Sequence, residues 1–249
     1  MAKLRRAVVG AAAVALAGAV GYTVGAYAAT EGLGIGVVRR GPARPMVALT
    51  FDDGPDHEYT PRILDALAAA GAIATFFMVG RQVTAAAAVA RAVAAAGHDL
   101  GNHTYAHRHL WTLPPAASVA EVDRGAAAIA NATGTSPRYF RPPWGTFNWA
   151  AYARAAQIGE ARILWSVRPE GMIVAADAPR MAAVVVRKAH RGAIVNLHDH
   201  GGHASTPRET WLALPTMIAG LRDRGFQVVP LRILLDDPPP PRRPRAAQL

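Results

Sequence analysis

Short runs of apolar residues alternate along the chain with longer segments in which apolar positions recur at helical spacing. The apolar runs predict strands at 46–51, 74–79, 98–103, 139–140, 162–167, 193–197 and 226–229. The segments between them predict helices at 60–70, 84–96, 118–134, 149–158, 179–190 and 208–224. This alternation predicts a parallel sheet. About seven strand–helix units in one domain favour an α/β fold of the irregular (β/α)7 type, a barrel related to the TIM barrel.

Residues that commonly begin or end helices support these boundaries. Thr60 and Pro61 fit the N-cap and the first turn of a helix. Ser118 and Glu121 have the spacing of a capping box. Gly134 stands where glycine commonly ends a helix. We therefore expect one helix to begin near residue 60 and another to run from about 118 to 134.

The first 30 residues have a different pattern. Three basic residues within the first six precede an uncharged run over residues 7–30, which contains the small-residue site Ala26-Tyr27-Ala28. These features are typical of a secretory signal peptide. The run also exceeds the roughly 20 apolar residues that span a bilayer, so an N-terminal membrane anchor is an equal alternative. A buried core helix is less favoured, because the run has no polar face.

The composition sets the remaining domain limits. Residues 31–44 are rich in Gly, Arg and Pro and are interpreted as a linker, and the Pro/Arg-rich residues 236–249 are predicted to be disordered. The folded domain is then 45–235. With 51% hydrophobic residues the chain can bury a core, and the absence of cysteine excludes disulfides and thiolate metal sites.

The N-terminal segment predicts the localisation. A cleaved signal peptide would make the protein secreted, and an anchor would hold it on the outer face of the cytoplasmic membrane.

The formal net charge of +10 lies partly outside this domain, in residues 1–44 and in the tail. The domain itself shows no basic stripe with interleaved aromatic residues, which a nucleic-acid binder would present. Nucleic acid is therefore excluded as a partner. Weak attraction to an anionic cell surface or membrane remains as the interpretation of the positive charge.

Three short stretches follow predicted strands and carry the candidate chemistry. They are Thr50-Phe51-Asp52-Asp53-Gly54-Pro55, His103-Thr104-Tyr105-Ala106-His107 and Leu197-His198-Asp199. Barrels of this class place their chemistry at the C-terminal ends of the strands. One carboxylate and two histidines fill three positions of a zinc-like ion and leave one open for water. A second carboxylate and a third histidine then remain to move protons.

The turn Phe140-Arg141-Pro142-Pro143-Trp144-Gly145 adds two further candidates. Arg141 is suited to hold a carboxylate in a bidentate contact. Trp144 fits either the wall of a pocket or the core. The histidines without comparable spacing are assigned structural or solvated roles; they are His57, His98, His109, His190, His200 and His203.

Together these stretches resemble the polysaccharide deacetylases of the NodB-homology group, carbohydrate esterase family 4. The resemblance covers about residues 45–235 and follows four of the five family motifs in order, at 50–55, 103–107, 141–145 and 197–198. It implies an irregular barrel of βα units that forms a single catalytic domain. It also implies that Asp53, His103 and His107 bind a divalent metal, most readily zinc with cobalt as an alternative. Asp52 would be the general base and His198 the general acid.

The resemblance implies supporting roles for three more residues. Arg141 would hold Asp52 in place. The backbone N–H of Trp144 would help to stabilise the oxyanion, and Leu197 and Trp144 would wall the acetyl methyl group.

The fourth motif departs from the family pattern. Trp165-Ser166-Val167 is present, but Arg168-Pro169-Glu170-Gly171-Met172 follows where the family has an aspartate that tunes the catalytic histidine. Glu170 or Asp177 would have to substitute, or the pocket is rearranged. An arginine beside the pocket favours an acidic sugar or wall polymer.

The expected protein is a monomeric, exported, metal-dependent deacetylase of N-acetylated polysaccharide, with peptidoglycan or chitin-like N-acetylglucosamine as the substrate. If the N-terminal segment is not cleaved, it would contact the membrane. Three alternatives remain: an esterase of O-acetylated xylan or other glycan, a glycan-binding protein without activity on the same fold, and an intracellular amidohydrolase. The export segment argues against the last.

Overall fold

A computed structural model describes residues 1–169, 177–201 and 207–235 of the chain. Seven parallel strands form one sheet in the order β5-β4-β3-β2-β1-β6, with β7 beside the start of β1. The strands are β1 (Met46–Asp52), β2 (Thr75–Met78), β3 (Asp99–Asn102), β4 (Tyr139–Phe140), β5 (Ala161–Arg162), β6 (Ala193–His198) and β7 (Gln227–Val228). The predicted parallel α/β fold is confirmed.

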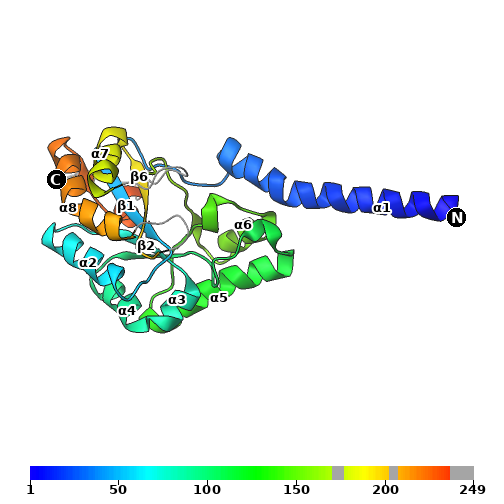
Figure 1. Ribbon diagram of the computed structural model, residues 1–249, viewed down its shortest axis with the longest axis horizontal. Helices are drawn as coiled ribbons and strands as arrows, with labels where there is room; N and C mark the ends of the chain where they lie inside the picture. Colours follow the sequence, from blue (N-terminus) through cyan, green and yellow to red (C-terminus); the bar gives the residue numbers. More distant parts are fainter. Residues whose placement is uncertain (170–176, 202–206, 236–249) are drawn as a thin grey trace, which may run out of the picture.

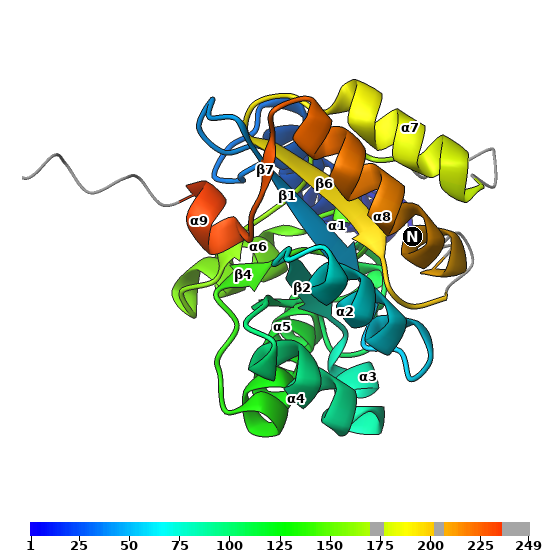
Figure 2. The same cartoon turned by 90° about the vertical axis from the view of Figure 1, so that its left-hand side faces the viewer.

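Helices follow the strands around the outside of the sheet (Figures 1 and 2). They are α2 (Tyr59–Ala69), α3 (Gly80–Ala85), α4 (Ala87–Ala95), α5 (Pro115–Thr133), α6 (Trp149–Gln157), α7 (Ala178–Lys188) and α8 (Pro207–Asp223). A short last helix, α9 (Leu231–Leu235), and two single 3₁₀ turns, η3 (Leu110–Thr112) and η4 (Pro143–Gly145), complete the domain. The predicted helix at 84–96 is divided in two at Ala86, whose backbone is not helical.

The two faces of the curled sheet bury different clusters. Leu49 and Phe51 of β1 point outward and pack with residues of the surrounding helices, such as Leu67 and Leu214. Ala48 points inward, where it meets buried side chains from the other strands and from α9; these include Phe77, Ile163, Ile194 and Leu231. Because side chains alternate along a strand, Thr50 and Asp52 also face inward. The inner face therefore changes from apolar to polar toward the C-terminal end of β1.

Isolated bridges close the seam between the edge strands β5 and β6. Val167 pairs with Val195 at the end of the seam nearest the C-terminal ends of the strands. Toward the other end, Val38 pairs with Ile163 and Arg40 with Ala193. The sheet thus curls into an irregular, incomplete barrel, which agrees with the predicted fold class. Residues 38 and 40, which the sequence suggested to be part of a linker, contribute to this closure.

The predicted capping box at Ser118 is wrong. Helix α5 begins three residues earlier, at Pro115, and both residues lie buried inside it. Ser118 Oγ accepts a hydrogen bond from Asn148, and Glu121 accepts one from the backbone N–H of Ala106. Their side chains thus hold neighbouring segments, which explains why residues of capping type occupy a helix interior. Thr60 likewise lies one residue inside α2.

Helix α1 (Ala2–Val20) projects from the domain (Figure 1). Two π-helical turns, η1 (Gly21–Gly25) and η2 (Ala28–Gly32), connect it to the body. The indole N–H of Trp149 donates to the carbonyl of Gly21 at 3.0 Å, and Ala26 and Thr30 are fully buried. In the part of the chain that the structure describes, no helix combines the length and the apolar character needed to cross a membrane. Residues 236–249, predicted to be disordered, lie outside the described residues.

Candidate active site

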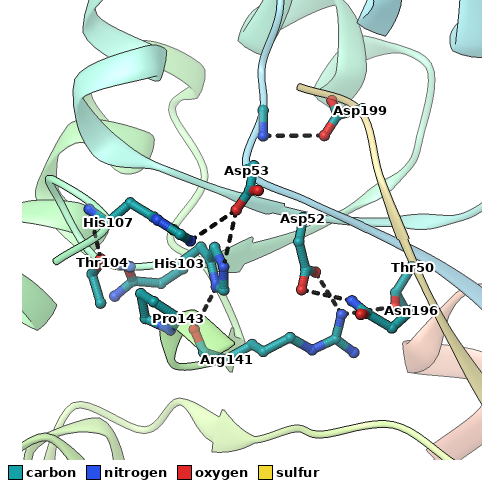
Figure 3. A network of polar contacts seen from close by, with 12 residues as sticks. Thr50, Asp52, Asp53, His103, Thr104, His107, Arg141, Pro143, Asn196 and Asp199 are labelled. Carbon is teal, nitrogen blue, oxygen red and sulfur yellow. Dashed lines mark hydrogen bonds and ion pairs between the residues drawn. The ribbon is translucent and has the colours of Figure 1, made fainter. Parts of the chain in front are cut away.

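The predicted site residues gather at the C-terminal edge of the parallel sheet. Asp52 ends β1 and His198 ends β6, and the two stand opposite each other in the strand register. His103 follows the last residue of β3, and Arg141 follows the last residue of β4. Asp52, His103 and His198 line a cleft of about 380 Å³, the size of a small-ligand site, and Arg141 lies buried behind it. Because parallel strands all end at this edge, segments far apart in the sequence meet there (Figure 3).

Three potential metal ligands face one another in this cleft. The ligand atoms of Asp53, His103 and His107 all lie within 4.8 Å of one another. Asp53 Oδ1 is 3.4 Å from Nε2 of His103 and 3.0 Å from Nε2 of His107, and it accepts no well-directed hydrogen bond from any described residue. Burial by itself would raise the pKa of Asp53, but the two histidines outweigh it and bring the pKa below its ordinary value. The carboxylate therefore stays ionised.

The orientation of His103 also fits metal binding. Its Nδ1 lies 2.7 Å from the backbone carbonyl of Arg141. Since a carbonyl can only accept, Nδ1 carries a proton, and Nε2, which points toward Asp53 and His107, is the nitrogen left to coordinate a metal. Histidine ligands are commonly fixed in this way by a hydrogen bond on the opposite ring nitrogen. The donor set and its orientation therefore fit a zinc-like divalent ion.

The loop that carries both histidines is not a helical turn, although side chains four residues apart would share one face of such a turn. Residues 103–107 have no helical assignment, and Thr104 and His107 have positive φ angles of 67° and 53°. The N–H of His107 donates to Thr104 Oγ1, and the N–H of Thr104 donates to Asn102 Oδ1. These hydrogen bonds hold the strained loop and point both rings into the cleft.

Positive φ angles recur in the other segments of the site. Asp53 has a φ of 77° and Trp144 a φ of 56°. With Thr104 and His107, these complete the set of non-glycine residues with positive φ in the described part of the chain. Such conformations cost about 1–3 kcal/mol each and persist where the surrounding structure fixes them. The chain therefore departs from relaxed geometry where side chains must enter the cleft.

Asp52 is held separately from the metal ligands. Arg141 Nη1 donates to its Oδ1 at 2.6 Å, and Asn196 Nδ2 donates to its Oδ2 at 2.7 Å. Arg141 is fully buried, and it also donates to Thr50 and to the carbonyls of Ile163 and Leu164. The contact expected between Arg141 and Asp52 is thus present, but as a single hydrogen bond rather than a bidentate one, because Asn196 occupies the second oxygen. It fixes the Asp52 carboxylate beside the metal-ligand group.

The remaining predicted residues occupy different places. His198 and Trp144 line the cleft, and the Trp144 ring is 53% exposed and packs against His107 and His109. Leu197 is fully buried in the outer core beside Phe51, and it is not among the residues that line the described cleft. Its expected contact with an acetyl methyl group stays a prediction.

Sequence reasoning missed two residues that shape the site. Asn196 donates a hydrogen bond to Asp52. The sequence could have indicated this residue, because it stands two residues before His198 and therefore on the same face of the strand. Asp199 is buried and accepts hydrogen bonds from the Gly54 N–H and the Thr60 hydroxyl, at 3.1 and 2.6 Å. Burial raises the pKa of Asp199 to about 7. Asp199 leaves no room for a Cβ at residue 54, which explains the glycine there.

Two of the histidines assigned structural or solvated roles lie closer to the cleft than expected. His200 lines it, and His109 stacks on Trp144 with a centroid distance of 5.0 Å. His98 does have the expected structural role, because its Nδ1 accepts from the N–H of Ala74. His57 is exposed, and His203 lies outside the described residues.

The altered fourth motif places Arg168 on the cleft wall. Of the two acids suggested as replacements, Asp177 caps helix α7 by accepting from the N–H of Arg180 at 2.8 Å. It does not line the described cleft. Glu170 lies outside the described residues.

Comparison with known proteins agrees with this geometry. The polysaccharide deacetylase family profile matches residues 39–162. A chitooligosaccharide deacetylase of Bradyrhizobium sp. is 35% identical over 74% of this chain and 88% of its own. A peptidoglycan-N-acetylglucosamine deacetylase of Bacillus cereus is 34% identical over 76% of this chain and 88% of its own. The chain belongs to the polysaccharide deacetylase family.

A solved structure from the same family adds a second comparison. The carbohydrate esterase family 4 pseudoenzyme of Bacillus anthracis superposes with a TM-score of 0.73 and 32% identity, over 80% of this chain and 69% of that one. The resemblance drawn from the sequence motifs is confirmed, and so is the irregular barrel. The protein is a hydrolase of the polysaccharide deacetylase class.

Loss of one of the three metal-binding side chains should weaken the binding of metal by this polysaccharide deacetylase. We expect His103→Ala to weaken zinc or cobalt binding by more than the roughly 10–100-fold that loss of an outer-shell partner costs, because a direct ligand disappears. His57→Ala, at an exposed histidine, is the matched control and should bind like the wild type. Titration calorimetry of the metal-free proteins measures both. Equal affinity in the two variants would contradict the assigned site.

The stability of the deacetylase should also depend on Glu160. This carboxyl is buried beside Asn102, and burial raises its pKa to about 8, from 4.5 when exposed. The folded state therefore keeps a proton that the unfolded state loses, so stability falls as pH rises from about 5 to 8. Glu160 should contribute at most ~1.4 kcal/mol per pH unit to this slope.

Glu160→Gln should flatten this part of the pH profile. The amide cannot ionise and can still accept from Asn102. Chemical denaturation at several pH values between 5 and 8 measures the difference, with the wild type as reference. Identical slopes would show that Glu160 does not retain the proton.

Proposed function

We propose that the chain is an exported, metal-dependent deacetylase that removes N-acetyl groups from N-acetylglucosamine units of cell-wall or extracellular glycan. Peptidoglycan and chitin-like chains are the proposed substrates, and acetate is the released product. One observation carries the proposal. A single cleft combines the metal-ligand group Asp53, His103 and His107 with a separately anchored carboxylate, Asp52, and a third histidine, His198.

The names of the relatives support this substrate class. The Bradyrhizobium and Bacillus cereus proteins are named for chitooligosaccharide and for peptidoglycan N-acetylglucosamine. Both share an N-acetylated glucosamine unit. The proposal assigns that unit, rather than either polymer, to this chain.

Asp52 has the position of a general base. Its carboxylate is held by Arg141 and Asn196, so it cannot turn away from the cleft during reaction. In the proposed mechanism it takes the proton of the attacking water. A positioned base of this kind contributes roughly 10²–10⁴-fold to the rate. When bound by Asp53, His103 and His107, zinc or cobalt would supply Lewis acidity and make water a stronger acid.

His198 and Trp144 serve the second half of the reaction. His198 lies beside Asp52 in the strand register and would protonate the amine that leaves with the sugar. The backbone N–H of Trp144 would donate to the oxyanion that forms on the acetyl carbonyl. The positive φ of Trp144, 56°, distinguishes the turn that would present this group. Leu197 is proposed to lie behind the acetyl methyl group.

A second candidate function is glycan binding without hydrolysis. Arg168 stands where the family has an aspartate, and a pseudoenzyme is among the similar structures. In this alternative the cleft would bind a glycan and release no acetate. An O-acetyl ester, as in xylan, is an alternative substrate for the same groups, since the attack on the carbonyl carbon is the same.

The decisive assay is release of acetate by the zinc-loaded protein from N-acetylglucosamine oligomers and from peptidoglycan. We expect acetate from the wild type and a loss on the order of 10²–10⁴ in kcat for Asp52→Asn, because the amide cannot accept the proton. Asp65→Asn, at an exposed aspartate of α2, is the matched control and should keep full activity.

The outcomes of this assay separate the candidates. Acetate from O-acetyl xylan alone would assign the esterase function. Zinc binding and glycan binding without acetate from any substrate would favour the binding protein.

Export is the remaining part of the proposal. It is supported by the basic residues at the start, the uncharged run over 7–30 and the small-residue site Ala26-Tyr27-Ala28. We expect a reporter enzyme active only outside the cytoplasm to be active when fused after residue 54. Removing residues 1–30 should abolish that activity. A reporter that stays inactive with the full segment would contradict export, and mass measurement of the exported protein distinguishes a cleaved signal from an anchor.

A further inference from the structure

Two arginines lie on the cleft wall beyond the groups that the proposed mechanism uses. Arg168 follows Val167, the residue that closes the barrel seam by pairing with Val195. Arg81 is the second residue of helix α3. Both line the same cleft as Asp52, Asp53 and His198.

The barrel wall fixes where Arg168 begins. The carbonyl of Val167 accepts from the N–H of Asn196 at 2.9 Å, which sets Arg168 beside the end of β6. Its guanidinium carbon lies 5.7 Å from the centre of the Trp165 ring. The same ring faces Arg141 at 5.6 Å. Trp165 therefore contacts two guanidinium groups, of which Arg141 is neutralised by Asp52.

Arg168 has no such neutralising partner in the described part of the chain. Its Nε is buried and makes no hydrogen bond there. Neither Arg168 nor Arg81 forms an ion pair with a carboxylate of the described residues. A buried donor that lacks a partner costs about 1–3 kcal/mol, so a group that supplies one would bind favourably.

The acids of the cleft are already engaged. Asp52 is bound by Arg141 and Asn196, and Asp53 faces the two histidines of the metal-ligand group. A bound divalent ion would add further positive charge. The cleft thus has an excess of positive charge that none of its described acids balances.

We propose that Arg168, assisted by Arg81, binds a carboxylate carried by the glycan chain. The preferred substrate is then a polymer in which N-acetylated sugars occur together with carboxylate-bearing sugars. This inference rests on the deacetylase function proposed above and deepens it. The planar guanidinium group matches a carboxylate in a two-point contact, which a neutral sugar cannot provide.

Three N-acetylated glycans test the proposal with the zinc-loaded, full-length protein. N-acetylglucosamine oligomers are neutral, muramyl glycan strands freed of peptide carry lactyl carboxylates, and hyaluronan oligomers carry uronate carboxylates. We expect Arg168→Gln to raise KM for the preferred carboxylate-bearing glycan about 10–100-fold, the range of a hydrogen bond to a charged group. The neutral oligomer should change by less than about threefold. The more strongly affected anionic glycan identifies the source of the carboxylate.

Two further variants keep the test specific. Arg91→Gln removes a charge from the exposed face of α4 and should leave all three substrates unchanged. Arg81→Gln should affect the carboxylate-bearing glycan in the same direction as Arg168→Gln, by a smaller factor. An equal loss on neutral and anionic substrates, or no loss with Arg168→Gln, would overturn the inference.

A binding measurement separates this inference from the deacetylase proposal. In an Asp52→Asn background, calorimetric titration with the same glycans reports affinity without turnover. Weaker binding of the anionic glycan on adding Arg168→Gln, with the neutral glycan unaffected, supports the carboxylate contact even if no acetate is released. Equal affinities with and without Arg168 overturn the contact even if the wild type is an active deacetylase.

Discussion

The buried positive charge of Arg141 is the interaction on which the site depends. A guanidinium group without exposure to water must be neutralised and hydrogen-bonded, because an unpaired buried charge costs several kcal/mol. Asp52 supplies the charge, and Thr50 and two carbonyls of the segment after β5 accept further hydrogen bonds. The backbone carbonyl of the same residue accepts from His103. One residue therefore fixes the orientation of the base and of a metal ligand together, and it ties β1, β3 and β4 at the level of the cleft.

The regular parts of this fold follow from local patterns, and most of them were predictable from the sequence. Apolar runs predicted most strands to within one residue at each end, since burial on both faces leaves little choice of residue along β1 and β6. The strand predicted at 162–167 is the exception, because β5 ends at Arg162. The gathering of the acid pair, the histidines and Arg141 in one place was also predictable, because strand ends of a parallel sheet meet at one edge. The role of each residue came from the resemblance to the family motifs. Asn196 lies on the same strand face as His198, two residues before it, but its contact with Asp52 was not predicted.

What the sequence did not predict depends on contacts between distant segments. The capping-type residues Ser118 and Glu121 serve neighbouring loops instead of a helix end, and no local pattern distinguishes these uses. The conformation of the 103–107 loop is set by positive φ angles that the surrounding hydrogen bonds maintain. The spacing of the two histidines fits a helical turn equally well, so spacing alone does not predict this loop. The role of Asp199 likewise depends on Gly54, which is 145 residues away.

The seam between β5 and β6 has a consequence for how such a protein can diversify. Between β1 and β6 and between β2 and β3, the strands are held by several successive pairs, so an inserted residue there would shift a whole register. At the seam, Val167 and Val195 form an isolated bridge, and the next residue, Arg168, belongs to no strand. Arg168 can therefore be exchanged for another side chain without displacing Asp53, His103 or His107. New ligand preferences can arise there while the reaction chemistry is inherited intact.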